Sequence, residues 1–160
     1  MRLEPQGYGE CLLATFAALS GVPLGAVRYQ AFEYSNGVNW WSYLNSNPWG
    51  AEKFINKICK ETNLNPDLFP VNFDFSSFSW KSFYEFLLKE NESVSLHGKG
   101  SICVISASKN CIQEYTAHVM PFENGKLFDL SFTPIIGETY EEYCKKRDRF
   151  YIKPLSIERI

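Results

Sequence analysis

The sequence lacks the features that mark membrane and secreted proteins. Its 160 residues contain no run of about 18 apolar residues, the length that a transmembrane helix requires. The N-terminal stretch MRLEPQGYGE has no apolar core of the kind found in a secretion signal. We therefore expect no membrane association and a cytoplasmic location, in the cell that produces the protein or in an infected cell.

Histidine is scarce, and the cysteines do not form metal-binding pairs. The chain has two histidines and five widely separated cysteines, at Cys11, Cys59, Cys103, Cys111 and Cys144, with no Cys-x-x-Cys motif. An odd number of separated cysteines favours free thiols in a reducing compartment over a disulfide framework. We expect no metal site, since zinc sites need clustered Cys and His ligands, and we expect no cofactor.

A cluster of basic residues is also missing. The formal net charge is −2, and lysine and arginine are scattered along the chain. The one dense charge run, CKKRDR at 144–149, is interpreted as a solvated helix end. A nucleic-acid partner is therefore not expected.

The order of the predicted elements indicates an α+β fold in a single domain spanning residues 1–160. Hydrophobic patterning and capping residues predict helices at 11–20, at 23–35, at 51–63, at 79–91 and at 138–147. Alternating or β-branched stretches predict strands at 70–79, at 100–108, in a hairpin at 115–132 and at 149–155. Helices come first and the strands follow, which favours an antiparallel sheet over a parallel one.

Cys11 lies where the apolar helix CLLATFAALS begins. A buried structural cysteine is more typical of a helix centre, whereas a thiolate is stabilised at the positive end of the helix dipole. Gly7 and Gly9 in the preceding QGYGEC allow a tight turn and leave the sulfur accessible. We interpret Cys11 as a nucleophile; the alternative is a core cysteine.

The late hairpin brings a histidine and an aspartate together. The dipeptide Asn124–Gly125 between apolar alternations predicts a two-residue turn. Facing residue numbers then sum to 249, so His118 faces Ser131. Asp129 lies diagonally across from His118 on the same face, about 7–8 Å away at the backbone. An aspartate there holds one ring nitrogen and leaves the other as a base.

These residues resemble the papain-like cysteine peptidases, and most of all the compact bacterial and phage-type members often described as peptidase C39-like. The resemblance rests on QGYGEC before a buried helix, on ALSGVPLGAV after it, on the late His and Asp, and on FTPIIGETYEEYCKK. It implies a papain-like fold, with the nucleophile on a buried helix of an N-terminal helical part and a C-terminal antiparallel sheet. It also implies a site formed, in chain order, by Gln6, Cys11, His118 and Asp129. Gln precedes Cys by five residues here, whereas the family usually has six.

The resemblance implies a cysteine peptidase acting on a peptide or isopeptide bond of a protein or peptide substrate. Cys11 is the nucleophile, His118 the general base and acid, and Asp129 its orienter. Gln6 and the Cys11 N–H are the expected oxyanion donors. Two alternatives stay open: an acyltransferase or transglutaminase-like enzyme on the same fold, and a non-catalytic interaction module. Substrate identity and oligomeric state cannot be derived from the sequence.

Other candidate residues receive structural interpretations. His97, in the polar stretch SLHGKG, is expected in a loop. The segment 38–50 is expected to be irregular, and if the protein is a peptidase its specificity is expected to come from this segment. Its tryptophans, at Trp40, Trp41 and Trp49, are nevertheless expected in the core rather than in a substrate groove.

Overall fold

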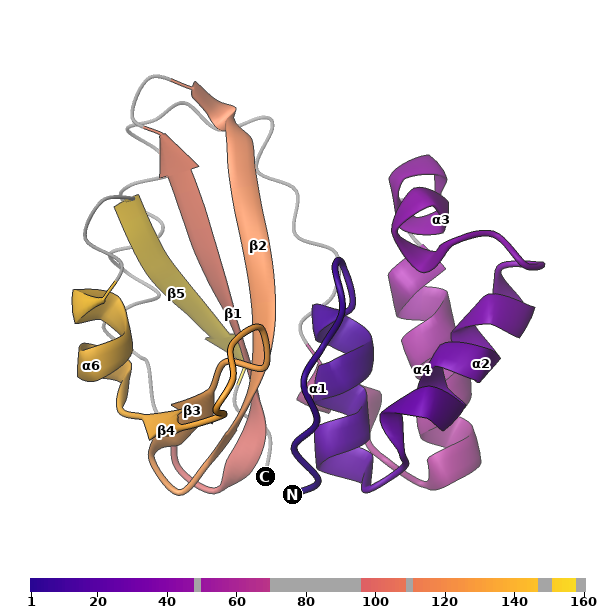
Figure 1. Cartoon of the computed structure of the whole chain (residues 1–160), viewed down its shortest axis with the longest axis horizontal. Coiled ribbons are helices and arrows are strands. Elements are labelled where there is room, and N and C mark those ends of the chain that lie inside the picture. Colours follow the sequence, from indigo (N-terminus) through magenta and orange to yellow (C-terminus); the bar gives the residue numbers. More distant parts are fainter. Residues whose placement is uncertain (48–49, 70–95, 109–110, 147–150, 158–160) are drawn as a thin grey trace.

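The computed structural model describes residues 1–47, 50–69, 96–108, 111–146 and 151–157. Its helical elements are α1 (Cys11–Ser20), α2 (Leu24–Tyr34), α3 (Trp40–Ser46), α4 (Gly50–Thr62), η1 (Pro66–Leu68) and α6 (Tyr140–Lys145). Its strands are β1 (Lys99–Ser108), β2 (Cys111–Glu123), β3 (Lys126–Phe128), β4 (Gly137–Glu138) and β5 (Tyr151–Ile157). The α+β class is confirmed (Figure 1). The predicted strand at 70–79, the predicted helix at 79–91 and Trp49 lie outside the described residues.

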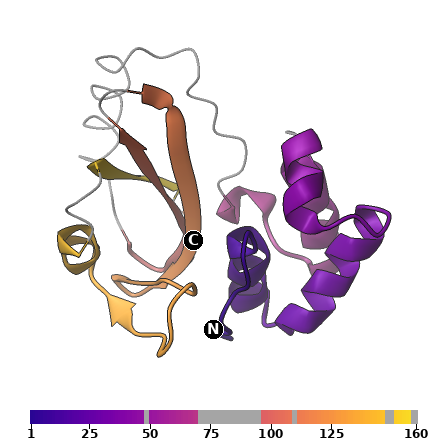
Figure 2. The ribbon, with the colours of Figure 1, turned by 45° about the horizontal axis from the view of Figure 1, so that its top comes forward.

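Helix α1 is the centre of the helical part. All eight residues from Leu12 to Leu19 are buried, as expected for a helix that is apolar on nearly every side. Gly21 ends the helix in the left-handed conformation (φ 77°) and donates its N–H to the Ala17 carbonyl. Pro23 stands directly before α2, so the helix begins one residue later than predicted. Figure 2 shows α1 between β2 and the other N-terminal helices.

The segment 38–50 is predicted to be irregular, and for Trp40–Ser46 that prediction is wrong. Residues Trp40–Ser46 form α3, because the Asn39 side chain accepts hydrogen bonds from the N–H groups of Trp41 (3.1 Å) and Ser42 (3.4 Å). Trp40 is buried and packs on the Phe54 ring, with ring centroids 5.0 Å apart. The Asn39 cap and the packing of Trp40 on Phe54 thus stabilise a helix in a segment rich in Asn and Trp.

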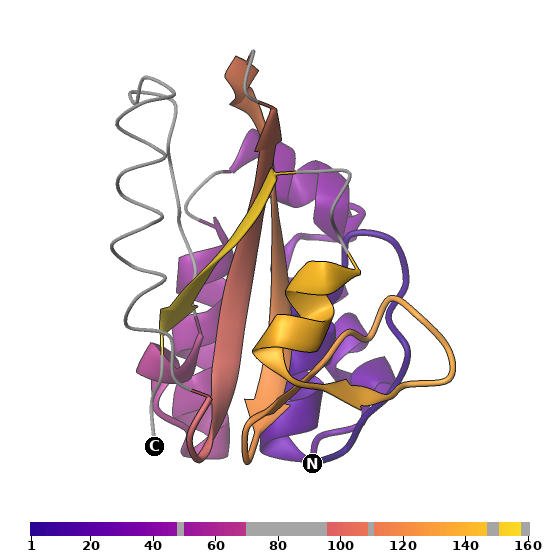
Figure 3. The same cartoon turned by 90° about the vertical axis from the view of Figure 1, so that its left-hand side faces the viewer.

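The strands form one antiparallel sheet in the order β4-β3-β2-β1-β5. One hydrophobic cluster joins the helices to Cys103 of β1 and Val119 of β2. A second cluster, which includes Met120 and Leu127, is closed by Tyr143 of α6. The sheet therefore lies between α1 on one side and α6 on the other (Figure 3). None of the described helices is long and apolar enough to cross a membrane.

The predicted hairpin is confirmed. Asn124 (φ 52°) and Gly125 (φ 83°) form its two-residue turn, and both have the positive φ that a type I′ turn requires. Phe122 pairs with Leu127, and the facing numbers sum to 249 as predicted. The predicted extent of the hairpin, to residue 132, is wrong: β3 ends at Phe128, so the chain leaves the sheet before it reaches the level of His118.

Candidate active site

Cys11 is the first residue of α1, as the sequence predicts. The chain enters the helix through Gly9, whose positive φ (71°) residues with a side chain rarely adopt. Among the described residues no side chain caps this helix end, so its first N–H groups remain available. One of them, the Leu12 N–H, helps to lower the pKa of the Cys11 thiol. The thiol is partly exposed at the positive end of the helix dipole.

His118 projects from β2 beside this helix end. Pairing between β2 and β3 starts only at Phe122, so at His118 the turn after β3 replaces a neighbouring strand. One helical turn beyond Cys11, Thr15 Oγ1 donates to the Val119 carbonyl at 3.3 Å. Because Thr15 is fully buried, this bond fixes α1 against the strand that carries the histidine.

Asp129 holds the imidazole from the far side. Its Oδ1 lies 2.9 Å from His118 Nε2, and the same oxygen accepts the Ser131 N–H at 3.0 Å. Ser131 Oγ also lies 3.3 Å from Nε2. Since Nε2 is occupied by these groups, Nδ1 is the ring nitrogen left for Cys11, whose thiol hydrogen-bonds the His118 side chain. The structure therefore brings Cys11, His118 and Asp129 into one chain of contacts.

The electrostatics of this chain favour an ion pair. Burial alone would raise the pKa of the Cys11 thiol, but the hydrogen bond and positive charge of His118, with backbone N–H groups, lower it below its ordinary 9.0. Burial alone would lower the pKa of His118, but its bonds to Asp129 and Cys11 raise it to about 9. Burial likewise opposes ionisation of Asp129, whose bond to His118 holds its pKa well below the ordinary 3.8. Both directions favour a thiolate beside an imidazolium over the neutral thiol–imidazole pair.

Two other cysteines have pKa values that are raised instead of lowered. Burial raises the pKa of Cys59 to about 11, and it raises the pKa of Cys103 further still. Both are fully buried core thiols. Among the described cysteine thiols, which also include the partly exposed Cys144, none is in a disulfide. A lowered pKa at Cys11 therefore reflects its surroundings rather than a general property of the chain's cysteines.

A cavity of about 480 Å³ opens over the thiol. Its lining comes from the loop before α1, from α3 and from the hairpin, namely Gln6, Gly7, Tyr8, Gly9, Cys11, Trp41, His118 and Ser131. Tyr8 is 86% exposed and stands edge-on to Trp41, with ring centroids 5.6 Å apart. The cavity thus offers a peptide-sized opening with the thiol and imidazole in its lining and an aromatic rim.

Gln6 lies in the lining of this cavity, although its interval to Cys11 is five residues. Its backbone N–H donates to the Leu130 carbonyl at 2.9 Å, which ties the loop to the turn that carries Asp129. Its Nε2 makes only a long contact, 3.5 Å, with the Gly7 carbonyl. Within the described part of the chain, its buried Oε1 has no hydrogen-bond partner. Within the described protein the Gln6 side-chain amide therefore makes only one weak hydrogen bond, and it is available to donate to a bound substrate.

The structure adds residues that the sequence interpretation did not assign to the site. Ser131 contacts both His118 and Asp129, and the facing-residue rule for the hairpin already placed it opposite His118. Trp41 lines the cavity and is 43% exposed, so its expected place in the core is wrong, whereas Trp40 is in the core. His97 is exposed in a loop, as expected. No local sequence signal distinguishes Trp41 from Trp40.

No known protein family, curated protein or solved structure matches this chain in the comparisons made. The function of the site is therefore inferred from its geometry and its chemistry.

Proposed function

We propose that the protein is a small papain-like thiol hydrolase that cleaves a peptide or isopeptide bond through a thioester intermediate. The observation that carries this proposal is the chain of contacts from Asp129 through His118 to Cys11 at the edge of a cavity. A nucleophile in contact with a base that a third group orients is the signature of covalent catalysis. The order Gln, Cys, His, Asp along the chain supports the papain-like assignment.

The first half of the reaction forms the acyl-enzyme. The Cys11 thiolate attacks the carbonyl carbon, a sulfur–carbon bond forms, and the carbonyl electron pair moves to oxygen. The intermediate collapses, the carbon–nitrogen bond breaks, and the His118 imidazolium gives its proton to the departing amine. A thioester on Cys11 and a neutral imidazole remain.

The second half releases the product. Neutral His118 takes a proton from water, the resulting hydroxyl attacks the thioester carbon, and the Cys11 thiolate departs. The carboxylic acid leaves, and the thiolate–imidazolium pair is restored. Asp129 stays ionised throughout and keeps Nε2 engaged, so that Nδ1 faces the sulfur in both halves.

Each half passes through a tetrahedral intermediate that carries a negative oxygen. The Cys11 N–H belongs to the uncapped first turn of α1, and the Gln6 side chain lines the same cavity. We assign these two groups as the oxyanion donors. Because a donor in such a site acts on charge that develops only in the intermediate, it accelerates the reaction without tightening substrate binding.

A covalent trapping experiment tests this proposal. The protein is mixed with p-nitrophenyl acetate, and the acetyl group is located by peptide mass spectrometry. We expect acetylation at Cys11 to outpace acetylation at Cys144, a partly exposed cysteine outside any disulfide that serves as an internal control. Cys11→Ser and His118→Ala should remove the fast phase. Equal rates at Cys11 and Cys144 in the native protein would refute a nucleophilic Cys11.

The same experiment separates hydrolysis from acyl transfer. An acyltransferase requires an amine to reach the thioester in place of water, and both reactions use the same residues. Adding glycinamide during turnover gives acetylglycinamide if an amine is accepted and acetate alone if it is not. The thiol hydrolase predicts mainly acetate. Acetylglycinamide as the main product would establish the acyltransferase, and absence of any acyl-enzyme would favour a non-catalytic interaction module.

A further inference from the structure

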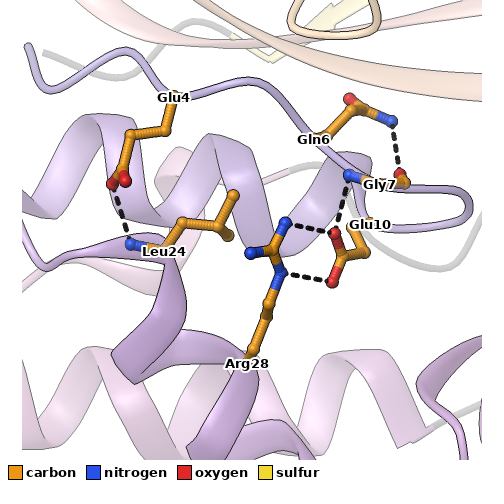
Figure 4. A network of polar contacts seen from close by, with 6 residues as sticks. All are labelled: Glu4, Gln6, Gly7, Glu10, Leu24 and Arg28. Atoms are coloured by element: carbon orange, nitrogen blue, oxygen red, sulfur yellow. Dashed lines mark hydrogen bonds and ion pairs between the residues drawn. The ribbon is translucent and has the colours of Figure 1, made fainter.

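An ion pair outside the catalytic contacts holds the loop that leads into Cys11. Arg28 of α2 donates from Nε to Glu10 Oε2 at 2.7 Å and from Nη2 to Glu10 Oε1 at 2.8 Å. Figure 4 shows this fork beside the loop. Two parallel bonds fix the plane of the carboxylate as well as its position. Glu10 directly precedes Cys11, so the fork acts next to the nucleophile.

The same carboxylate reaches back along the loop to Gly7. The Gly7 N–H donates to Glu10 Oε1 at 2.7 Å, and the Glu10 N–H donates to the Gly7 carbonyl at 3.3 Å. A Cβ at position 7 would lie 2.6 Å from Oε1, so a larger residue would displace the carboxylate. Two hydrogen bonds between its first and last residues, Gly7 and Glu10, therefore close this loop, and Gln6 lies immediately before it.

Two more bonds tie this loop to the elements around it. Glu4 Oε2 accepts the N–H of Leu24, the first residue of α2, at 2.8 Å (Figure 4). The Gln6 N–H donates to the Leu130 carbonyl, beside Asp129. The helix that carries Arg28 and the turn that carries Asp129 are thus both fixed relative to the loop.

We propose that Arg28 and Glu10 are positioning residues that hold the Gln6 side chain and the Cys11 N–H where the oxyanion of the substrate develops. This inference rests on the proposed thiol chemistry, and it assigns a part of that site that no motif in the sequence marks. Neither residue touches the reacting atoms in this role; Arg28 acts through Glu10, and Glu10 acts through Gly7. The donors must stand about 2.7–3.1 Å from the oxyanion, so small displacements matter.

Two reagents separate a positioning role from a merely structural one. Iodoacetamide alkylates a thiolate by displacing iodide and forms no oxyanion. p-Nitrophenyl acetate acylates the same thiolate through a tetrahedral oxyanion and releases p-nitrophenolate. A loss of oxyanion donors therefore slows acylation of Cys11 and leaves its alkylation unchanged. A general loosening of the site, or a change in the pKa of Cys11, slows both reactions.

The variants are Arg28→Ala, Arg28→Lys and Gly7→Ala, with the rates mapped to Cys11 by mass spectrometry. We expect Arg28→Ala and Gly7→Ala to slow acylation about 10- to 100-fold, the scale on which small misplacements and lost oxyanion donors act. Alkylation and its pH profile should stay within about twofold of the native values on the same argument. Arg28→Lys retains a charge that can reach Glu10 and should restore part of the acylation rate.

A matched control and a double variant complete the test. Lys57→Ala removes a different ion pair with a glutamate, the exposed Lys57–Glu61 pair of α4 (3.3 Å), and should change neither reaction. Gln6→Ala should slow acylation of Cys11 and leave its alkylation unchanged. Because part of the oxyanion site is already lost in Gln6→Ala, adding Arg28→Ala should reduce the acylation rate by a smaller factor than Arg28→Ala does in the native protein.

Two results would overturn the positioning role. One is an Arg28→Ala variant that acylates at the native rate; the other is equal slowing of acylation and alkylation in it. Failure of the underlying thiol chemistry gives a different result: native Cys11 then shows no advantage over Cys144 with either reagent. The two failures are therefore distinguishable in one set of measurements.

Discussion

Asp129 Oδ1 lies 2.9 Å from His118 Nε2 and accepts the backbone N–H of Ser131 at 3.0 Å. The backbone bond fixes the carboxylate oxygen, and the oxygen in turn fixes the imidazole. Asp129 is 7% exposed, so its charge acts on His118 with little screening by solvent. The position of the histidine ring is therefore set by a buried carboxylate and not by packing alone.

Asp129→Asn tests this relationship. The amide keeps the shape of the carboxylate but removes its charge, so the pKa of His118 should fall towards its ordinary 6.5 and the thiolate of Cys11 should lose its counter-ion. We expect acylation of Cys11 at pH 7 to slow by about 10²-fold, within the range for impaired acid–base catalysis. Stopped-flow release of p-nitrophenolate measures the rate. A rate within about twofold of native would contradict the role of Asp129.

The same pair makes stability depend on pH. The pKa of His118 is raised from 6.5 to about 9, so its contribution is fully present below about pH 6.5 and is lost as pH rises through about 9. Asp129, whose pKa is lowered from 3.8, contributes above that value. We expect the difference in unfolding free energy between native protein and Asp129→Asn to be largest at pH 4–6.5 and to shrink by pH 9.5. Urea titrations across this range measure it; a difference that grows with pH would be inconsistent with the pairing.

Thr15→Val tests the bond between α1 and β2. Valine keeps the volume of threonine but removes the hydroxyl that donates to the Val119 carbonyl at 3.3 Å. We expect a loss of about 1–2 kcal/mol in unfolding free energy, the scale for a buried hydrogen bond whose acceptor loses its partner. Urea denaturation measures it. Thr62→Val, which removes a hydroxyl bonded within α4 (2.7 Å to the Ile58 carbonyl), is the control. Thr62→Val should leave the alkylation rate of Cys11 unchanged, whereas Thr15→Val should lower that rate.

Tyr8→Ala tests the aromatic rim of the cavity. Tyr8 is 86% exposed and contacts Trp41, so its loss should not affect folding but should remove apolar surface from the opening. We expect KM for p-nitrophenyl hexanoate to rise roughly five- to tenfold, from about 50 Å² of lost apolar contact, while acetate turnover changes little. Tyr29→Ala, at an exposed tyrosine outside the cavity lining, is the control. Equal changes in KM in the two variants would show that Tyr8 does not contribute to substrate binding.

Local signals are sufficient to predict most of the elements and the catalytic candidates. Helix α1 follows from an apolar run that ends at Gly21, and the hairpin follows from Asn124–Gly125, since both patterns act within a few residues. The position of this one turn correctly predicts that Asp129 lies beside His118, although Asp129 reaches the histidine from the turn after β3 and not from a paired strand. The helix start at Cys11 is predictable from the same kind of local pattern.

Contacts between distant segments are not predictable in this way. Arg28 binds Glu10 across 18 positions of sequence, and no spacing rule links a loop residue before one helix to a residue within the next helix. Trp41 lines the cavity while its neighbour Trp40 is buried, which depends on how α3 is rotated against α4. The place of Gln6 in the cavity depends on the path of a closed loop and not on the Gln–Cys interval.

The pKa of the Cys11 thiol tests the central claim most directly. Its alkylation by iodoacetamide is measured from pH 4 to 10, with the product mapped by mass spectrometry, in native protein and in His118→Ala. We expect the midpoint of the pH dependence to lie below the ordinary 9.0 in the native protein and to rise clearly in His118→Ala, because the imidazolium is the main stabiliser of the thiolate. A native midpoint at or above 9.0, or one that does not move in His118→Ala, would contradict this claim.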